Sequence, residues 1–275
     1  MAVDIPFSID SELAVQTAGL TRRFDTLVAV DSVDLALERR SIFGLLGPNG
    51  AGKSTTIKIL TTLLAPSEGA ARVAGFDVER EATQVRRCIG YVPQLLSADG
   101  SLTGYENLML SAKLYAIPRA ERVERINDSL AFMGLLNSAR ALVKTYSGGM
   151  VRRLELAQAM LHRPAVLFLD EPTIGLDPVA RHAVWERLLE SRSRFDMTVL
   201  ITTHDMEEAG ELCDRLAIMQ AGRVAAEGSP EELKHQVGPN ATLDEVFAHF
   251  GVGTVEEGGR YRDVRNARRT ASRLG

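Results

Sequence analysis

The stretch that most limits what this chain can fold into is a glycine-rich octapeptide, G-P-N-G-A-G-K-S, at residues 47–54. It fits the pattern G-x-x-x-x-G-K-[ST], in which successive backbone N–H groups curl around the phosphates of a nucleotide. Gly50 and Gly52 stand where such a loop requires dihedral angles that other residues rarely adopt. The pattern predicts a phosphate-binding loop, and a decorative glycine-rich turn is the alternative.

The residues on either side of the octapeptide favour the first interpretation. The mostly apolar run S-I-F-G-L-L at 41–46 predicts a strand, and residues 53–64 place Ile57, Leu60 and Leu64 on one helical face. Strand, glycine-rich loop and helix is the order that phosphate binding requires.

Acidic residues follow a second apolar strand, V-L-F-L-D-E at 166–171. Ligands bind at the carboxyl ends of strands in open α/β sheets, which is where Asp170 and Glu171 stand. We expect Lys53 to reach the β- and γ-phosphates, and the Ser54 hydroxyl to ligate Mg²⁺. Asp170 is suited to hold the Mg²⁺ water shell and Glu171 to act as general base, with two solvated carboxylates as the alternative.

Between these motifs the pattern changes. Residues 13–46 read as short strands, and residues 104–163 read as mostly helical, with a break at Pro118. From residue 164 the α/β pattern returns, and L-A-I-M followed by A-G-R-V predicts a hairpin that turns at 221–222. The sequence therefore predicts an α/β core with a helical insert.

A second candidate anion cradle is T-Y-S-G-G-M at 145–150, directly before a segment with helical apolar spacing. A serine and two glycines at a helix start can hold an anion. Taken alone, the segment also fits a helix cap with glycine hinges.

With these motifs in this order, the sequence resembles the ATPase subunit of an ATP-binding-cassette (ABC) transporter over residues 13–235. The signature of that family begins L-S-G-G-Q, and here Tyr146 and Met150 replace the Leu and the Gln. In the family two copies stack head to tail, and this segment contacts the γ-phosphate held by the other copy. The resemblance implies that Ser147, Gly148 and Gly149 act on the partner's nucleotide.

The resemblance carries over further positions one by one. Phe24 matches an aromatic that stacks on adenine, although a core phenylalanine is the alternative. Gln94 matches the Q-loop glutamine that contacts Mg²⁺, Asp177 ends the D-loop G-L-D at the dimer seam, and His204 matches the switch histidine.

The implied site has three sets of residues. The catalytic residues are Lys53, Glu171 and His204, and the residues that hold Mg²⁺ are Ser54, Gln94 and Asp170. The residues implied to bind ATP are Phe24, Gly47, Pro48, Asn49, Gly50, Ala51, Gly52, Lys53, Ser54, Thr55 and Gln94.

The implied fold is α/β: a P-loop NTPase core with an N-terminal antiparallel β subdomain and an inserted α-helical subdomain. The ATPase domain is expected at 13–235, with its helical insert at about 95–163, and a C-terminal extension with a basic tail at 236–275. The six arginines of that tail fit either a solvated segment or contact with anionic lipid or an acidic partner loop.

Composition narrows the expected partners. The net charge of −4 gives no support to nucleic-acid binding, and no apolar run approaches the ~20 residues that cross a bilayer. The N-terminus lacks the basic region of a secretory signal, and two unpatterned cysteines are typical of reduced thiols. We therefore expect a peripheral protein at the cytoplasmic face of the membrane.

The arginines after Y-S-G-G-M resemble the exporter branch that moves drugs, natural products or lipids. The implied ligands are ATP and Mg²⁺, and the implied partners are an integral membrane permease and a second copy of the chain. A soluble ABC ATPase that remodels a non-transport complex is the main alternative, and a nucleotide-gated binding module is another. The turn E-R-R-S at 38–41 departs from a Gly-Glu pair of many relatives, without expected effect on catalysis.

Overall fold

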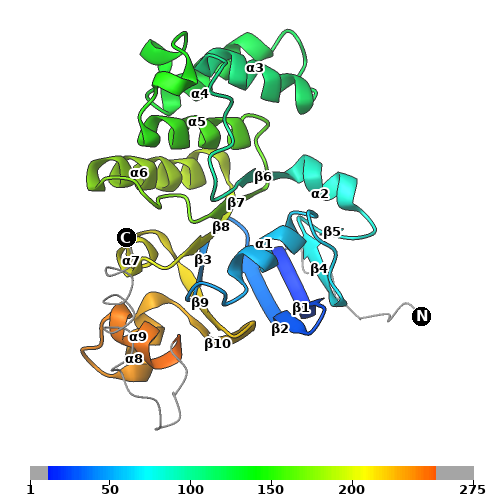
Figure 1. The fold of residues 1–275 in the computed structure, drawn as a ribbon, viewed down its shortest axis with the longest axis vertical. Coiled ribbons are helices and arrows are strands. Elements are labelled where there is room, and N and C mark those ends of the chain that lie inside the picture. Colours follow the sequence, from blue (N-terminus) through cyan, green and yellow to red (C-terminus); the bar gives the residue numbers. More distant parts are fainter. Residues whose placement is uncertain (1–11, 252–275) are drawn as a thin grey trace, which may run out of the picture.

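The computed structural model describes residues 12–251, and Figure 1 shows their arrangement. An antiparallel sheet has the strand order β2-β1-β4-β5. Its strands are β1 (Leu13–Phe24), β2 (Leu27–Glu38), β4 (Glu68–Val73) and β5 (Phe76–Asp77).

A second sheet of six strands has the order β10-β9-β3-β8-β7-β6. Its strands are β3 (Ile42–Leu46), β6 (Ile89–Val92), β7 (Val166–Asp170), β8 (Thr198–Thr203), β9 (Arg215–Gln220) and β10 (Arg223–Gly228). All pairings are parallel except the β9–β10 hairpin, whose turn at 221–222 confirms the sequence prediction.

Parallel strands buried on both faces explain the unbroken apolar runs at β3 and β7. Phe43 and Phe168 point into a core shared with β1, β2 and α1 (Lys53–Leu60), so α1 packs between the two sheets. Ile42 and Leu169 point the other way, into a larger core under the helices. Because each face is covered, the ends of the strands are where polar groups can gather.

The segment expected to be mostly helical forms the upper part of the molecule in Figure 1. It contains α3 (Gly104–Leu114), α4 (Arg122–Phe132) and α5 (Gly148–Met160), with short 3₁₀ turns at Leu136–Ser138 and Val143–Thr145. Pro118 lies between α3 and α4, as expected of a helix breaker.

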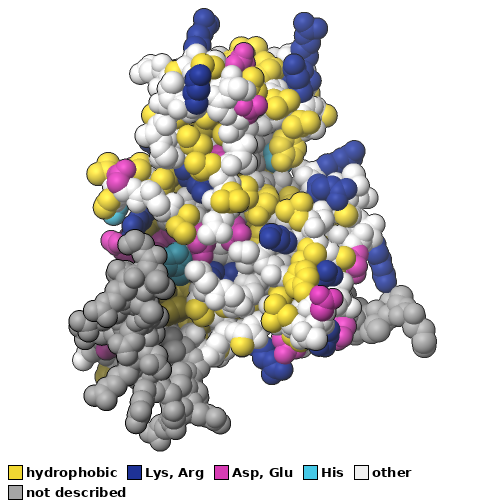
Figure 2. Space-filling view, in the orientation of Figure 1, with side chains coloured by type: hydrophobic (Ala, Val, Ile, Leu, Met, Phe, Trp, Pro, Cys, Tyr) yellow, Lys and Arg dark blue, Asp and Glu magenta, His cyan; other side chains and the backbone are white. Residues whose placement is uncertain are grey.

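The other helices flank the sheets. They are α2 (Ala82–Cys88), α6 (Pro178–Phe195), α7 (Met206–Leu212), α8 (Pro230–Val237) and α9 (Leu243–Phe250). None of the helices within residues 12–251 is both long enough and apolar enough to span a bilayer. Acidic, basic and apolar side chains are interspersed over the face drawn in Figure 2, with several Lys or Arg side chains projecting at the end formed by α3 and α4.

One sequence expectation is wrong at its boundary. The helix expected over 53–64 ends at Leu60, and Leu64 lies beyond it. Thr62 adopts φ 63°, and the N–H groups of Leu63 and Leu64 both donate to the Lys58 carbonyl, which closes the helix. The arginine-rich tail predicted at the C-terminus lies outside the described residues.

Candidate active site

The octapeptide forms a loop between β3 and α1, as the sequence predicts. Gly52 begins α1 with φ 106°, and a Cβ there would lie 2.5 Å from the Ala29 carbonyl oxygen, so only glycine fits. No side chain caps this helix start. Its first backbone N–H groups are therefore available to an anion, which the helix dipole also favours.

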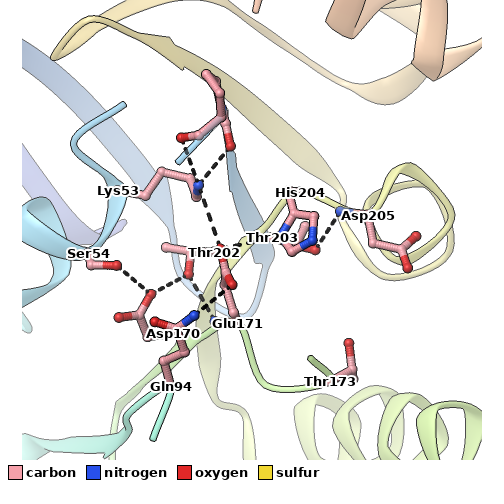
Figure 3. A network of polar contacts seen from close by, with 12 residues as sticks. Lys53, Ser54, Gln94, Asp170, Glu171, Thr173, Thr202, Thr203, His204 and Asp205 are labelled. Carbon is pink, nitrogen blue, oxygen red and sulfur yellow. Dashed lines mark hydrogen bonds and ion pairs between the residues drawn. The ribbon is translucent and has the colours of Figure 1, made fainter. Parts of the chain in front are cut away.

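Lys53 lies at the centre of the site with only 5% of its surface exposed. Its Nζ donates to the carbonyl oxygens of Gly47 (2.7 Å) and Pro48 (3.3 Å) and lies 3.7 Å from Glu171 Oε1 (Figure 3). Burial lowers the pKa of Lys53, and the negative charges of Glu171 and Asp170 oppose that shift. A phosphate group could accept hydrogen bonds from this ammonium and from the first N–H groups of α1.

Asp170 ends β7 and is buried beside the loop. Its Oδ1 accepts hydrogen bonds from Ser54 Oγ (3.0 Å) and Thr202 Oγ1 (2.7 Å), which joins the end of β8 to α1. The side-chain atoms that could ligate a metal here are hard oxygens. No group of three His, Cys, Asp or Glu side chains suited to a metal occurs within the described chain. This set fits Mg²⁺, which is commonly held by one or two carboxylates together with phosphate oxygens and water.

Glu171 follows directly in the left-handed region, at φ 48°. Its N–H donates to the Thr202 carbonyl (3.1 Å) and to Thr202 Oγ1 (3.0 Å), which holds this uncommon conformation. Its carboxylate is buried, with Oε2 accepting from Gln94 Nε2 (3.0 Å) and Oε1 lying 3.3 Å from His204 Nδ1. Lys53, Gln94 and His204 thus meet at the Glu171 carboxylate, although they come from three separate segments.

His204 follows β8 at the same edge of the sheet, and its side chain is 51% exposed. The next residue, Asp205, caps α7 by accepting from the N–H groups of Glu207 and Glu208, and it pairs with Arg181 at 2.6 Å. The histidine is therefore carried on a backbone that is held from both sides, while its ring remains accessible.

A cleft of about 620 Å³ lies over the loop. One side is formed by Phe24, Leu27, Val28 and Ala29, and the other by residues 49–55 with Gln94 and Glu171. Phe24 is 41% exposed, so the alternative of a core phenylalanine does not hold, and the Arg22 guanidinium lies 4.6 Å from its ring centroid. An apolar wall beside a phosphate cradle suits a purine nucleoside triphosphate.

The serine and glycines of the second cradle lie elsewhere. Ser147 caps α5, and its Oγ accepts from the Met150 N–H at 3.3 Å. Ser147 and Gly148 are exposed, whereas Gly149 is buried against α6, where an added Cβ would lie 2.7 Å from that of Ala180. None of these three residues lines the nucleotide cleft.

Asp177 also lies apart from the cleft, at the start of α6. It is exposed, and its Oδ1 accepts from the Ala180 N–H at 2.9 Å. Ala180 therefore contacts both the D-loop aspartate and Gly149 of the second cradle.

Sequence reasoning missed two residues of this region. Thr202 holds both Asp170 and Glu171, and buried Glu208 accepts from Thr173 Oγ1 (2.7 Å) and Trp185 Nε1 (2.9 Å) behind them. The polar pair T-T at the end of an apolar strand was the available signal for Thr202. Glu208 left no such signal, because its partners come from distant segments.

This fold and this site define a P-loop protein that binds a nucleoside triphosphate with Mg²⁺. Comparison with known proteins gives the family. The ABC transporter family profile matches residues 30–174. The daunorubicin/doxorubicin resistance ATP-binding protein DrrA of Streptomyces peucetius is 45% identical over 227 residues, which cover 82% of this chain and 68% of that protein.

The Nod factor export ATP-binding protein I of Cupriavidus metallidurans is 42% identical over 219 residues, which cover 80% of this chain and 72% of that protein. Among solved structures, an ATP-binding subunit of an ABC transporter superimposes with a TM-score of 0.78 at 31% identity, over 86% of this chain and 99% of that one. A dimeric ATP-binding cassette bound to ADP and phosphate gives 0.71 at 26% identity, over 78% and 98% of the two chains.

The chain belongs to the ABC transporter family. It is the subunit that binds ATP with Mg²⁺ and hydrolyses it, and it works in association with a membrane as part of a transporter.

Proposed function

We propose that this subunit powers export by a separate membrane permease, and that two copies close head to tail around two ATP molecules. In that dimer Ser147, Gly148 and Gly149 of one copy contact the γ-phosphate held by Lys53 of the other. Asp177 lies at the seam between them. Each catalytic site is then shared between two chains.

One observation supports this proposal: the start of α5, where Ser147 and Gly148 are exposed, lines no part of its own subunit's cleft. A capped helix start with two glycines offers N–H groups and a positive dipole end to an anion. The cleft of the same subunit already holds the loop, the Mg²⁺ ligands and the buried glutamate. A second copy is the partner that would use the exposed cradle.

Within one subunit the residues divide the work. Lys53 and the first N–H groups of α1 hold the β- and γ-phosphates, and Phe24 stacks on the adenine. Mg²⁺, held by Ser54, Gln94 and Asp170, supplies a positive charge to the phosphates when it is bound. Catalysis of this kind is mostly placement and electrostatics.

Glu171 and His204 act where the attacking water meets the γ-phosphate. The Glu171 carboxylate orients a water and takes its proton, and Gln94 and His204 keep that carboxylate in place through the contacts at 3.0 and 3.3 Å. His204 also reaches the γ-phosphate from its exposed position. These roles are supported by the meeting of three chain segments at one buried carboxylate.

The cargo class is inferred from relatives. One relative is named for daunorubicin and doxorubicin resistance and another for Nod factor export. We extend this to a drug, natural product or lipid as cargo for the permease, with this subunit at the cytoplasmic face. Motion would pass to the permease through residues 94–118.

A Glu171→Gln variant tests the shared site. With saturating Mg–ATP it should bind nucleotide, lose nearly all turnover and accumulate dimer, as measured by analytical ultracentrifugation. A Glu171→Gln/Ser147→Arg variant is the matched control and should bind ATP but stay monomeric. A Glu171→Gln protein that remains monomeric with bound ATP contradicts the proposal. Separately, co-purification with an integral membrane protein distinguishes the transporter subunit from a soluble remodelling ATPase.

A further inference from the structure

A buried ion pair lies on α5, outside the catalytic contacts described above. Arg152 and Glu155 are 2% and 3% exposed, and Arg152 Nη1 lies 3.0 Å from Glu155 Oε2. They stand five and eight residues after Ser147, on the same helix that begins at the exposed cradle.

Both members of the pair also bind the backbone of the segment that carries Gln94. Arg152 Nη1 donates to the Pro93 carbonyl (2.8 Å), and its Nη2 donates to the Gln94 carbonyl (2.9 Å). Glu155 Oε1 accepts from the N–H groups of Ser97 and Ala98. The segment 93–98 is thus held to α5 from both sides of Gln94.

The side chain of Gln94 belongs to the other part of the molecule. Its Nε2 donates to Glu171 Oε2 at 3.0 Å, whereas the strand before it, β6, pairs with β7 in the core sheet. A single residue therefore has its backbone fixed to the helix that begins at Ser147 and its side chain fixed to the catalytic carboxylate.

Stability alone does not account for this pair. Removing two charges from water is costly, and well-packed apolar residues often replace a buried ion pair without loss. Desolvation lowers the pKa of Arg152 despite the opposing charge of Glu155, and Arg152 Nε has no hydrogen-bond partner within the described chain. What the charges add over apolar side chains is a set of directional bonds to backbone groups at 93–98.

We infer that Arg152 and Glu155 are positioning residues that make the Gln94 segment move with α5. When the partner's nucleotide engages Ser147, the pair transmits that engagement to Gln94 at the subunit's own nucleotide. Each site thereby senses whether the other is closed. This inference rests on the proposed head-to-tail dimer, and it adds the contact through which the two sites communicate.

Variants of the pair must separate coupling from folding. Removal of one partner leaves a buried unpaired charge and is expected to destabilise the chain strongly. The double variant Arg152→Met/Glu155→Leu removes both charges at similar volume, and the backbone groups it releases lie at an exposed segment where water can satisfy them. Its melting temperature, measured first, should stay close to that of the parent.

Hydrogen exchange of a peptide covering 93–98 then reads the coupling. All proteins carry Glu171→Gln so that ATP persists, and Mg–ATP is the ligand. A Ser147→Arg variant in the same background binds ATP without closing, and so it gives the effect of a subunit's own nucleotide alone. In the parent, dimer closure should slow exchange of this peptide at least tenfold beyond that reference.

The double variant should form the dimer as the parent does, while its peptide exchanges at the same rate as in the double variant that also carries Ser147→Arg, which lacks the same two Glu155 bonds and does not close. If closure slows exchange equally in the double variant, the inference is wrong. If no dimer forms in the parent, the proposed function fails instead, and ultracentrifugation of the same samples distinguishes the two failures.

Discussion

The two anion cradles of this chain are built in opposite ways. The loop at 47–54 lies in a cleft where Lys53, Asp170 and Glu171 are nearly fully buried. Lys53 forms an ion pair with Glu171, and Asp170 accepts a hydrogen bond from Ser54. At the start of α5, Ser147 and Gly148 are exposed, and Ser147 Oγ caps the helix by accepting from the Met150 N–H. The first holds fixed charges in place for chemistry, whereas in the proposed dimer the second would present its N–H groups to the partner's nucleotide.

The comparison also separates two uses of glycine. Gly52 is required by its own backbone, at φ 106° and close to Ala29. Gly149 has ordinary helical geometry, and it is required because α6 packs directly against it at Ala180. Gly149 therefore packs against α6, whose N-cap is Asp177, and in the proposed dimer this packing would fix the orientation of the α5 start.

The largest expected effect comes from breaking the exposed cradle. Ser147→Arg should lower the ATPase rate at least 100-fold, about 2.7 kcal/mol in activation free energy, because the helix start can no longer approach a phosphate. ATP affinity of the monomer should change by less than about twofold, because Ser147 takes no part in its own cleft.

ATPase assays and equilibrium nucleotide binding measure the two quantities for this variant. Ser193→Arg, which adds the same charge to an exposed serine of α6, is the control and should keep full activity. Equal loss of binding and hydrolysis would instead assign Ser147 to its own site.

A substitution in the buried site around Asp170 should have a smaller effect, on the Mg²⁺ dependence of the ATPase. Thr202→Val removes the hydroxyl that donates to Asp170 and should raise the Mg²⁺ concentration for half-maximal ATPase activity about 10- to 100-fold. Thr198→Val, at another buried threonine of β8, is the matched control because its hydroxyl accepts from the Arg40 N–H. An equal shift in both variants would show that the effect is one of strand stability.

Buried Glu208, which lies behind the catalytic residues, makes the stability of the protein depend on pH. Burial raises the pKa of Glu208 above its ordinary 4.5. Deprotonation of Glu208 therefore lowers the stability of the folded state. Wild-type stability from this group is greatest below pH 4.5 and is lost as the pH rises through the raised folded pKa. Glu208→Gln keeps an acceptor for Thr173 and Trp185, so it should gain stability relative to wild type as the pH rises through that window.

Glu208→Leu is the contrasting variant, because it leaves two buried donors without an acceptor. It should lose about 2 to 5 kcal/mol at neutral pH. Urea unfolding at several pH values measures both variants. A Gln variant whose stability runs parallel to wild type at every pH would contradict the assignment of the titrating group.

The smallest effect is expected far from both cradles, at the turn before β3. Arg40 adopts φ 63° and forms an exposed ion pair with Asp196 at 3.3 Å. Arg40→Gly relieves the backbone strain but adds freedom to the unfolded chain, so the free energy of unfolding should change by no more than about 1 kcal/mol. Arg40→Ala keeps the strain and should be the less stable of the two.

This turn also tests the sequence expectation that its altered chemistry leaves catalysis alone. ATPase activity of both Arg40 variants should match wild type. A change of more than about twofold would mean that the turn acts on the phosphate loop at the other end of β3.

The sequence predicted well what depends on neighbouring residues. The loop at 47–54 and its flanking strand and helix are local, and the strand-end positions of Asp170 and His204 follow from apolar runs. The end of α1 was missed because Thr61 and Thr62 read as helical, although Thr61 bonds back to Ile57 and Thr62 leaves the helix.

The sequence does not predict which residues far apart in the chain bond to each other. The bonds from Arg152 to Pro93 and Gln94 join positions about sixty residues apart, and nothing in the local pattern of either segment specifies the other. The same is true of Glu208, whose partners lie on α6 and in the loop after β7. The division of the chain at 13–235 and 236–275, with its insert at about 95–163, remains a prediction.

A complementation assay tests the shared site most directly. Ser147→Arg and Glu171→Gln subunits, each nearly inactive alone, are mixed at increasing ratios, and ATPase activity is measured. Because a mixed dimer contains one site with an intact Glu171 and an intact partner Ser147, activity should reappear and peak near an equal ratio. A mixture that stays as inactive as its components at every ratio, although mixed dimers form, would contradict the account.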